Sequence, residues 1–282
     1  VVPFETPEII MQGIGDYYKN HLVVLRDDLI PYYLGGNKAR KAYFYQKKFE
    51  KNGIDCVLTY GSAKSNHARS IALMAQSIGI DSILISPDDE KSLNNNQRIR
   101  LISNMKVISS AVSEVEQRIS ETMLELNNKY SNPFFIPGGG HDIIGITAIV
   151  DLMFKIQEWE KKQNFFFNKI YFASGTGGTQ AGLIIGKKIV DFFRKKEIKN
   201  DLSNVSDIKS DVDILGISIA RQKENGIAAV VDAFNIFSDC FSSSEFVPEK
   251  NEDIDVNFNT KYILGGYGDY NKDISNLIFN IL

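Results

Sequence analysis

The feature that most constrains the fold of this chain is a regular alternation between short apolar runs and longer amphipathic segments. The apolar runs have the length of buried strands, and the amphipathic segments have the spacing and the end signals of helices. The expected strands are 56–60, 82–85, 106–109, 133–136, 170–174 and 214–219. The expected helices are 39–51, 66–79, 94–104, 112–129, 143–162 and 178–195. Strands that alternate with helices form parallel sheets flanked by helices, so we predict an α/β fold.

Composition argues against several classes of protein. A net charge of −3 gives no basic field for nucleic acid. Cys56 and Cys240 are too few for a disulfide framework or a structural zinc site, and we expect no metal site. The start, VVPFETPEII, lacks the features of a signal peptide, and no apolar run is long enough for a membrane span. We therefore predict a cytoplasmic protein with no membrane partner.

The loops after the expected strands are the places to look for chemistry, because ligands of parallel α/β folds bind beyond the carboxyl ends of the strands. The segment Ser174–Leu183, SGTGGTQAGL, connects a strand to a helix. Its glycines let backbone N–H groups converge, and the start of a helix adds positive potential, so it is a candidate phosphate cradle. No Lys-Ser or Lys-Thr pair ends it, so it is not a Walker A loop. A tight turn with glycine for packing is the alternative.

Two further loops are rich in polar or small residues. The segment Gly61–Arg69, GSAKSNHAR, places Ser65, Asn66 and His67 at the start of a helix, where helix capping by Ser65 or Asn66 is the simplest interpretation. The segment Pro137–Asp142, PGGGHD, has three consecutive glycines, which suggest either a backbone close to a ligand or a hinge. Nothing in this pattern by itself makes its histidine a catalyst.

A lysine stands where a solvated helix would favour an acid. In LGGNKARK, Lys38 lies at the head of a helical run, although the positive end of a helix repels cations. A glycine loop for phosphate without a nucleotide motif, together with such a lysine, suggests pyridoxal 5′-phosphate (PLP). This cofactor has both a phosphate and an aldehyde that condenses with lysine. The alternative is that Lys38 is an ordinary surface charge.

These segments together resemble one family. GGNKARK, GSAKSNHAR and SGTGGTQAGL are similar to motifs of the fold-type II PLP-dependent enzymes of the 1-aminocyclopropane-1-carboxylate (ACC) deaminase and D-cysteine desulfhydrase group. Ile136–Gly140 and Gly265–Gly268 also match in order. The resemblance extends over residues 7–270 and implies PLP as the cofactor.

The resemblance also implies roles for individual residues. Lys38 would form the internal aldimine and move protons at the α-carbon of the substrate. Asn66 would hydrogen-bond the 3′-oxygen of the cofactor. The phosphate would be held by Gly175, Thr176, Gly177, Gly178 and Thr179.

Substrate contacts follow from the same resemblance. Ser65 would lie by the substrate carboxylate and act as an acid–base or nucleophilic group, and Tyr267 would face the substrate as a further catalytic residue. His67 stands where relatives have histidine or glutamine, and we expect it to contact the substrate. Lys64 stands where the family has glutamine. Its ammonium group would suit a more acidic substrate or depress the pKa of a neighbouring lysine; the alternative is that it points to solvent and has little effect.

The family fold, which resembles that of tryptophan synthase β, has two α/β domains with the cofactor between them. It implies a small domain at 42–148 and a large domain made of 1–41 and 149–282. Relatives are usually homodimers, and they continue with an Asp-Pro-x-Tyr-x-Gly-Lys segment that contacts the pyridine nitrogen. No such segment is found here, so we expect the large domain to lack its C-terminal part.

The resulting hypothesis is a PLP-dependent lyase or deaminase of amino-acid metabolism. It would act on a small amino acid of the D-cysteine or ACC type through the Lys38 aldimine and give an α-keto acid and ammonia. A racemase on the same site and a non-catalytic or divergent PLP-binding protein are the alternatives. A nucleotide-binding domain is disfavoured because the nucleotide motifs are missing.

Overall fold

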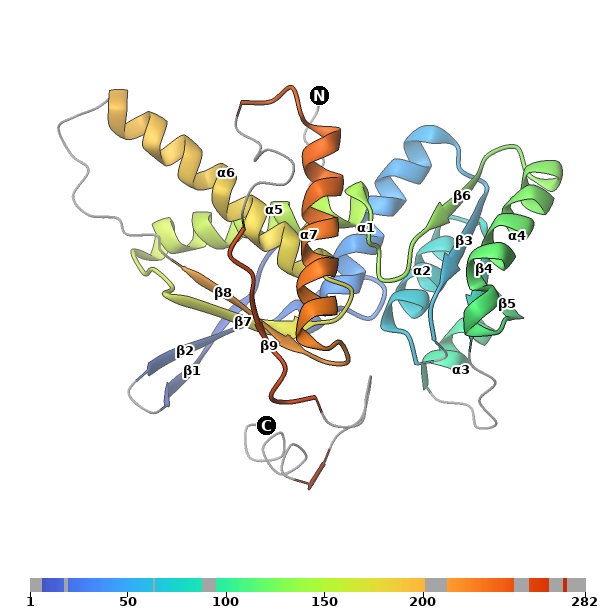
Figure 1. The fold of residues 1–282 in the computed structure, drawn as a ribbon, viewed down its shortest axis with the longest axis horizontal. Helices are drawn as coiled ribbons and strands as arrows, with labels where there is room; N and C mark the ends of the chain where they lie inside the picture. Colours follow the sequence, from blue (N-terminus) through green and yellow to red (C-terminus); the bar gives the residue numbers. More distant parts are fainter. Residues whose placement is uncertain are drawn as a thin grey trace. The chain divides into compact units, whose positions relative to one another are not determined.

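The computed structural model describes residues 7–17, 20–62, 64–87, 95–200, 212–245, 254–263 and 271–272. The chain forms two compact units, Val1–Ile156 and Gln157–Leu282, which are described one at a time below (Figure 1). The domain boundaries expected from the family resemblance, at 42 and 148, remain a prediction.

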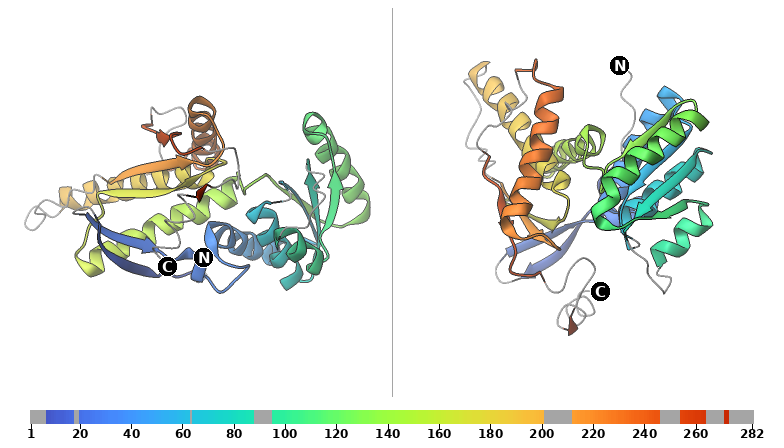
Figure 2. Two further views of the ribbon diagram at one scale, coloured as in Figure 1. Left: turned by 90° about the horizontal axis from the view of Figure 1, so that it is seen from below. Right: turned by 45° about the vertical axis from the view of Figure 1, so that its right-hand side comes forward.

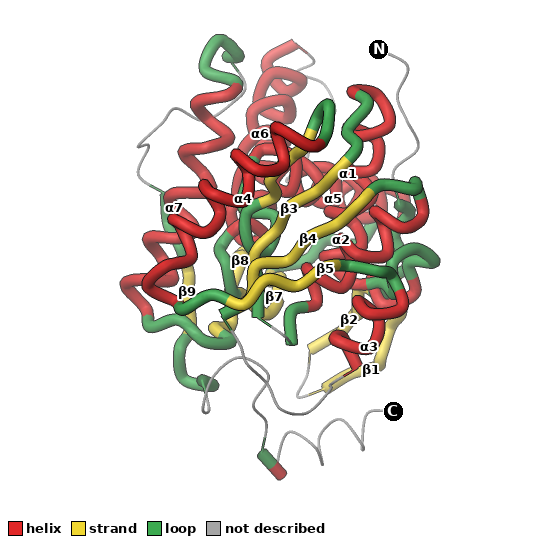
Figure 3. The backbone as a smooth tube through the Cα atoms, turned by 90° about the vertical axis from the view of Figure 1, so that its right-hand side faces the viewer, coloured by secondary structure: helices red, strands yellow, loops and turns green. Residues whose placement is uncertain are grey.

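The first unit contains a four-stranded parallel sheet. Its strands are β3 (Cys56–Tyr60), β4 (Asp81–Ser86), β5 (Lys106–Ser109) and β6 (Pro133–Ile136), in the spatial order β5-β4-β3-β6. Figure 3 shows β3, β4 and β5 side by side. The bounds of β3, β5 and β6 agree with those predicted from the sequence. In such an arrangement all the carboxyl ends lie at one edge, where the loops that follow β3 and β6 come together.

Helices cover both faces of this sheet. Helices α1 (Gly36–Asn52) and α2 (Asn66–Ser77) cover one face and α4 (Val115–Lys129) covers the other; α3 (Asn95–Ile102) packs against α2, and α5 (Ile143–Gln163) follows β6. Val57, Leu84 and Ile136 pack in one core with α1 and α2, whereas Leu58 and Ile85 pack in a second core with α4. Figure 2 (left) shows the strands between α4, in green, and α1 and α2, in blue to teal. The doubly covered sheet explains why Cys56, Val57 and Leu58 of β3 are apolar in succession.

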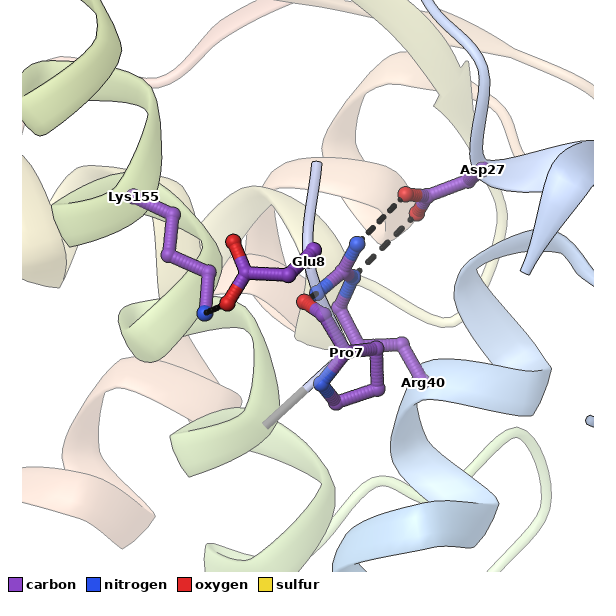
Figure 4. Close-up of polar contacts among 5 residues, drawn as sticks. All are labelled: Pro7, Glu8, Asp27, Arg40 and Lys155. Atoms are coloured by element: carbon purple, nitrogen blue, oxygen red, sulfur yellow. Dashed lines mark hydrogen bonds and ion pairs between the residues drawn. The ribbon is translucent and has the colours of Figure 1, made fainter. Parts of the chain in front are cut away.

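An antiparallel hairpin and a buried ion pair hold the start of α1. The hairpin, β1 (Met11–Tyr17) and β2 (Asn20–Leu25), leads into a short 3₁₀ helix, Asp27–Leu29; its antiparallel pairing was not predicted. Arg40 is fully buried and its Nη2 lies 2.7 Å from Oδ1 of Asp27, while its Nη1 donates to the carbonyl of Pro7 at 2.7 Å (Figure 4). Lys155 of α5 pairs with the neighbouring Glu8 at 3.2 Å. These contacts anchor the helix that carries Lys38.

The second unit has a three-stranded parallel sheet with the order β7-β8-β9. Its strands are β7 (Lys169–Ser174), β8 (Asp213–Ser218) and β9 (Asn257–Asn259), and its helices include α6 (Gly178–Asn200) and α7 (Lys223–Cys240). Helices α6 and α7 pack against each other, and both contact the sheet. Neither α7 nor β9 was predicted from the sequence. Among the residues that the structure describes, no helix is long and apolar enough to cross a membrane.

Candidate active site

Lys38 lies in the first turn of α1, after a tight glycine turn. Gly35 has a φ of +64°, and a Cβ there would lie 2.5 Å from the carbonyl oxygen of Asp28, so only glycine fits. Lys38 is partly buried and its Nζ donates to the carbonyl of Gly139 at 3.1 Å. Burial lowers the pKa of Lys38 from 10.5 to about 8. A neutral amine is the nucleophilic form of lysine, so this environment suits condensation with an aldehyde.

A second lysine on the same helix, which the sequence analysis missed, is fully buried. Nζ of Lys41 donates to the carbonyls of Gly139 and Gly140 at 3.1 and 3.0 Å. Its pKa is held well below the ordinary value, first by burial and then by the charge of Lys38, while Asp142 acts in the opposite direction. The signal in the sequence was the spacing of three residues from Lys38, which places two side chains on one helix face.

The PGGGHD loop after β6 receives both lysines. Gly139 and Gly140 have φ values of +73° and +64°, and the loop closes with a hydrogen bond from N of Gly140 to the carbonyl of Pro137 at 2.9 Å. Oδ1 of Asp142 accepts from N of Gly145 at 2.9 Å and thereby caps α5. The loop therefore presents carbonyl oxygens to two amines, and the positive end of its helix is already occupied by a carboxylate.

In the GSAKSNHAR loop, the capping interpretation is confirmed for Ser65. Its Oγ accepts from N of Ala68 at 3.1 Å at the start of α2. Asn66 is the first residue of α2 and is exposed, as is the side chain of Lys64. Asn96 of α3 contacts both of these residues.

His67 is buried beneath the loop, with only 2% of its surface exposed. Oγ1 of Thr59 lies 3.1 Å from its Nε2 and donates its proton to the carbonyl of Ile136 at 2.9 Å, so Nε2 carries the ring hydrogen. Burial and the neighbouring lysines Lys38 and Lys41 hold the pKa of His67 well below 6.5, so the ring is neutral. Its Nδ1 has no hydrogen-bond partner among the described residues.

The SGTGGT loop belongs to the second unit and connects β7 to α6. Gly177 has a φ of +86°, and a Cβ there would lie 2.5 Å from the carbonyl oxygen of Ala229. Nε of Arg221 donates to the carbonyl of Gly175 at 2.9 Å, which turns that oxygen toward the guanidinium. The first turn of α6 contains no acidic residue, and its N–H groups have no acceptor within the helix. The loop thus fits an anionic group such as a phosphate.

The predicted site residues divide between the two units. Lys38, Lys64, Ser65, Asn66 and His67 lie in the first unit, close to the carboxyl ends of β3 and β6, whereas Gly175, Thr176, Gly177, Gly178 and Thr179 lie in the second. Tyr267 and the GGYG segment lie outside the described residues.

Comparison with known proteins identifies the family. The profile of the family described as "Pyridoxal-phosphate dependent enzyme" matches residues 3–199, and the chain belongs to this family. It is 30% identical over 188 residues to a D-cysteine desulfhydrase of Serratia proteamaculans, covering 64% of this chain and 57% of that protein. It is 31% identical over 197 residues to a putative ACC deaminase of Pyrococcus abyssi, covering 68% and 58%. The chain thus spans little more than half the length of these relatives.

A solved structure confirms the fold class. The crystal structure of an ACC deaminase homologue superposes with a TM-score of 0.75 at 24% identity, over 99% of this chain and 78% of that one. The fold is therefore that of the fold-type II PLP-dependent enzymes, as the sequence predicted, and PLP is the cofactor of the family.

Proposed function

We propose that this protein is a PLP-dependent lyase or deaminase that acts on a small amino acid of the D-cysteine or ACC type and releases an α-keto acid and ammonia. The proposal rests on the position of the Lys38 amine and on its lowered pKa. Its amine is held 3.1 Å from the Gly139 carbonyl, and burial lowers its pKa to about 8. The relatives named D-cysteine desulfhydrase and ACC deaminase indicate the substrate class.

The family resemblance assigns each end of the cofactor to a different group of residues. PLP supplies an aldehyde for a lysine and, when bound, a conjugated ring that withdraws electrons from the α-carbon of the substrate. Lys38 would carry the aldehyde end, and the N–H groups of Gly175, Thr176, Gly177, Gly178 and Thr179 would hold the phosphate. The absence of an acidic residue from the first turn of α6 supports this assignment, because no carboxylate of that turn competes with the phosphate.

Proton transfer is the second task that we assign to Lys38. A general base works best when its pKa lies near the working pH, and a lysine with a pKa of about 8 meets that condition where an ordinary lysine does not.

Ser65 would contact the substrate carboxylate with its hydroxyl hydrogen, since its oxygen already accepts from Ala68. Lys64, whose side chain is exposed, would add positive charge for the substrate. The substrate roles of His67 and Tyr267 stay part of the proposal.

The test is a visible absorption spectrum of the protein with added PLP, followed by borohydride reduction and peptide mass spectrometry. We expect a band for the lysine-bound cofactor in the wild type, its absence in Lys38→Ala, and a PLP-modified peptide that carries the label on Lys38 and not on Lys41. Addition of D-cysteine or ACC should change the band and release an α-keto acid. A label elsewhere, or none, refutes the role of Lys38.

The same assay separates the alternatives. A labelled Lys38 with no keto acid from either substrate indicates a non-catalytic PLP-binding protein, and inversion of an amino acid without keto-acid release indicates a racemase. From the family resemblance we also propose that the protein is a cytoplasmic homodimer. Light scattering of the purified protein measures its oligomeric state.

A further inference from the structure

Hydrogen bonds from a side-chain amide of α3 reach the start of α2 in the first unit. Nδ2 of Asn96 lies 2.7 Å from the carbonyl oxygen of Lys64 and 3.0 Å from Oδ1 of Asn66. We propose that Asn96 is a positioning residue that sets the orientation of the Asn66 amide, so that Asn66 acts toward the cofactor as a hydrogen-bond donor. This inference rests on the proposed function, because it concerns the residue assigned to the 3′-oxygen of PLP.

The orientation follows from which atoms can donate. A backbone carbonyl can only accept, so the amide atom of Asn96 that lies 2.7 Å from the Lys64 oxygen must be its NH₂ nitrogen. That same nitrogen lies 3.0 Å from Asn66, so the Asn66 atom facing it must be an acceptor, which is Oδ1. The assignment therefore rests on a backbone atom whose identity is certain, and not on a choice between amide flips.

The contact made by the oxygen of the Asn96 amide agrees with this orientation. Nη1 of Arg69 lies 3.5 Å from Oδ1 of Asn96, and a guanidinium can only donate. A reversed Asn96 would place its NH₂ group against the guanidinium and its oxygen against the Lys64 carbonyl. Both contacts would then be repulsive. The hydrogen bonds that link Arg69, Asn96 and Asn66 therefore have a fixed donor-to-acceptor direction, from Arg69 to Asn96 and from Asn96 to Asn66.

The consequence for Asn66 is that only its NH₂ group remains for a ligand. Its Oδ1 is used by Asn96, and its Nδ2 has no acceptor among the described residues. Two N–H donors in the first turn of α2 suit an anionic oxygen, because the helix start adds positive potential. A deprotonated 3′-oxygen of PLP is such an atom, whereas an Asn66 turned the other way would meet it with a second acceptor.

The first part of the test measures PLP affinity of the ligand-free protein. Asn96→Ala should bind PLP about tenfold more weakly than the wild type, as loss of one well-oriented hydrogen bond predicts. Asn95→Ala is the matched control, because Asn95 is the exposed neighbour of Asn96 in α3, and it should bind as the wild type does. Equal affinity of Asn96→Ala and Asn95→Ala overturns the proposal.

The second part asks whether Asn96 acts through Asn66. The double variant Asn66→Ala/Asn96→Ala should bind PLP no more weakly than Asn66→Ala alone, since the amide to be oriented is gone. Additive losses would show that Asn96 merely supports the fold, and would also overturn the proposal. Labelling of Lys38 by PLP and borohydride should persist in Asn96→Ala, so a failure of the proposed function, seen as an unlabelled wild type, is a distinct result.

A measurement on the wild type covers the case in which Asn96→Ala does not fold. In NMR spectra of the ligand-free protein, the NH₂ hydrogens of Asn96 should exchange slowly with water and those of Asn66 quickly. The Asn66 NH₂ signals should shift and slow on addition of PLP. The reverse pattern before PLP is added overturns the proposal.

Discussion

Two glycine-rich loops of similar composition have opposite polarity in this protein. PGGGHD connects β6 to α5 and turns the carbonyl oxygens of Gly139 and Gly140 toward two lysine amines. SGTGGT connects β7 to α6 and turns one carbonyl toward Arg221, which leaves the N–H groups at the start of α6 without a helical acceptor. The first loop is therefore suited to cations and the second to anions.

The helix that follows each loop reinforces the difference. The start of α5 is capped by the carboxylate of Asp142, whereas the first turn of α6 contains no acidic residue. A helix start that already holds a carboxylate offers little to a phosphate, and one without it retains its positive potential. Glycine content thus permits close approach of the backbone, and the neighbouring side chains decide which backbone group faces the ligand.

The largest effect should come from the glycine that closes the second loop. In Gly177→Ala, a methyl group would meet the carbonyl of Ala229 at 2.5 Å while φ stays positive, so we expect a loss of about 3 kcal/mol or more in the free energy of unfolding. Gly79→Ala is the control, because its φ is +72° but nothing lies within 4 Å, and strain alone should cost about 1 kcal/mol. Urea denaturation followed by circular dichroism measures both. Equal losses would mean that packing against α7 is unimportant.

The first loop should depend instead on a charged side chain. Lys41→Met removes the side-chain donor to the Gly140 carbonyl and leaves the Gly139 carbonyl with Lys38 alone, so we expect a loss of about 2 kcal/mol. Lys48→Met, at an exposed position on the same helix, should change stability by less than about 0.5 kcal/mol. The same denaturation experiment measures both variants. If Lys41→Met did not change the free energy of unfolding, the contrast between the two loops would be wrong.

The lysines of the first loop should also make cofactor binding depend on pH. Because the pKa of Lys38 is lowered to about 8, its amine is mostly protonated at pH 7 and mostly neutral at pH 9. The rate of PLP incorporation should therefore rise about tenfold between these values and level off above them. Stopped-flow absorption measures this rate. A rise centred near 10.5 would show that Lys38 behaves as an exposed lysine.

The smallest effect concerns Arg221, which orients the second loop from a more exposed position. Arg221→Ala should reduce stability by less than about 1 kcal/mol, because an exposed hydrogen bond contributes little, yet weaken PLP binding several-fold through the freed Gly175 carbonyl. Titration with PLP and with inorganic phosphate tests this. An unchanged affinity for both ligands would show that Arg221 does not contribute to anion binding by the loop.

Much of the architecture was determined by local sequence. Strands β3, β5 and β6 were predicted with their observed bounds from short apolar runs bounded by polar residues, although only β3 is largely buried. The cap at Ser65 was likewise local, since it joins residues three positions apart. Helix α7 was missed although it has an ordinary apolar face, and the pairing of β1 with β2 into a hairpin was not predicted.

Only the tertiary structure decided how the candidate site is held. Lys41 meets Gly139 across 98 positions of the chain, and Asn96 meets Asn66 across 30. His67 is buried with its Nε2 beside Thr59, and its expected contact with the substrate stays a prediction. Spacing along a strand or helix reveals which residues share a face. It does not reveal which distant donor meets which acceptor, because those pairs form only when the sheet brings its loops to one edge.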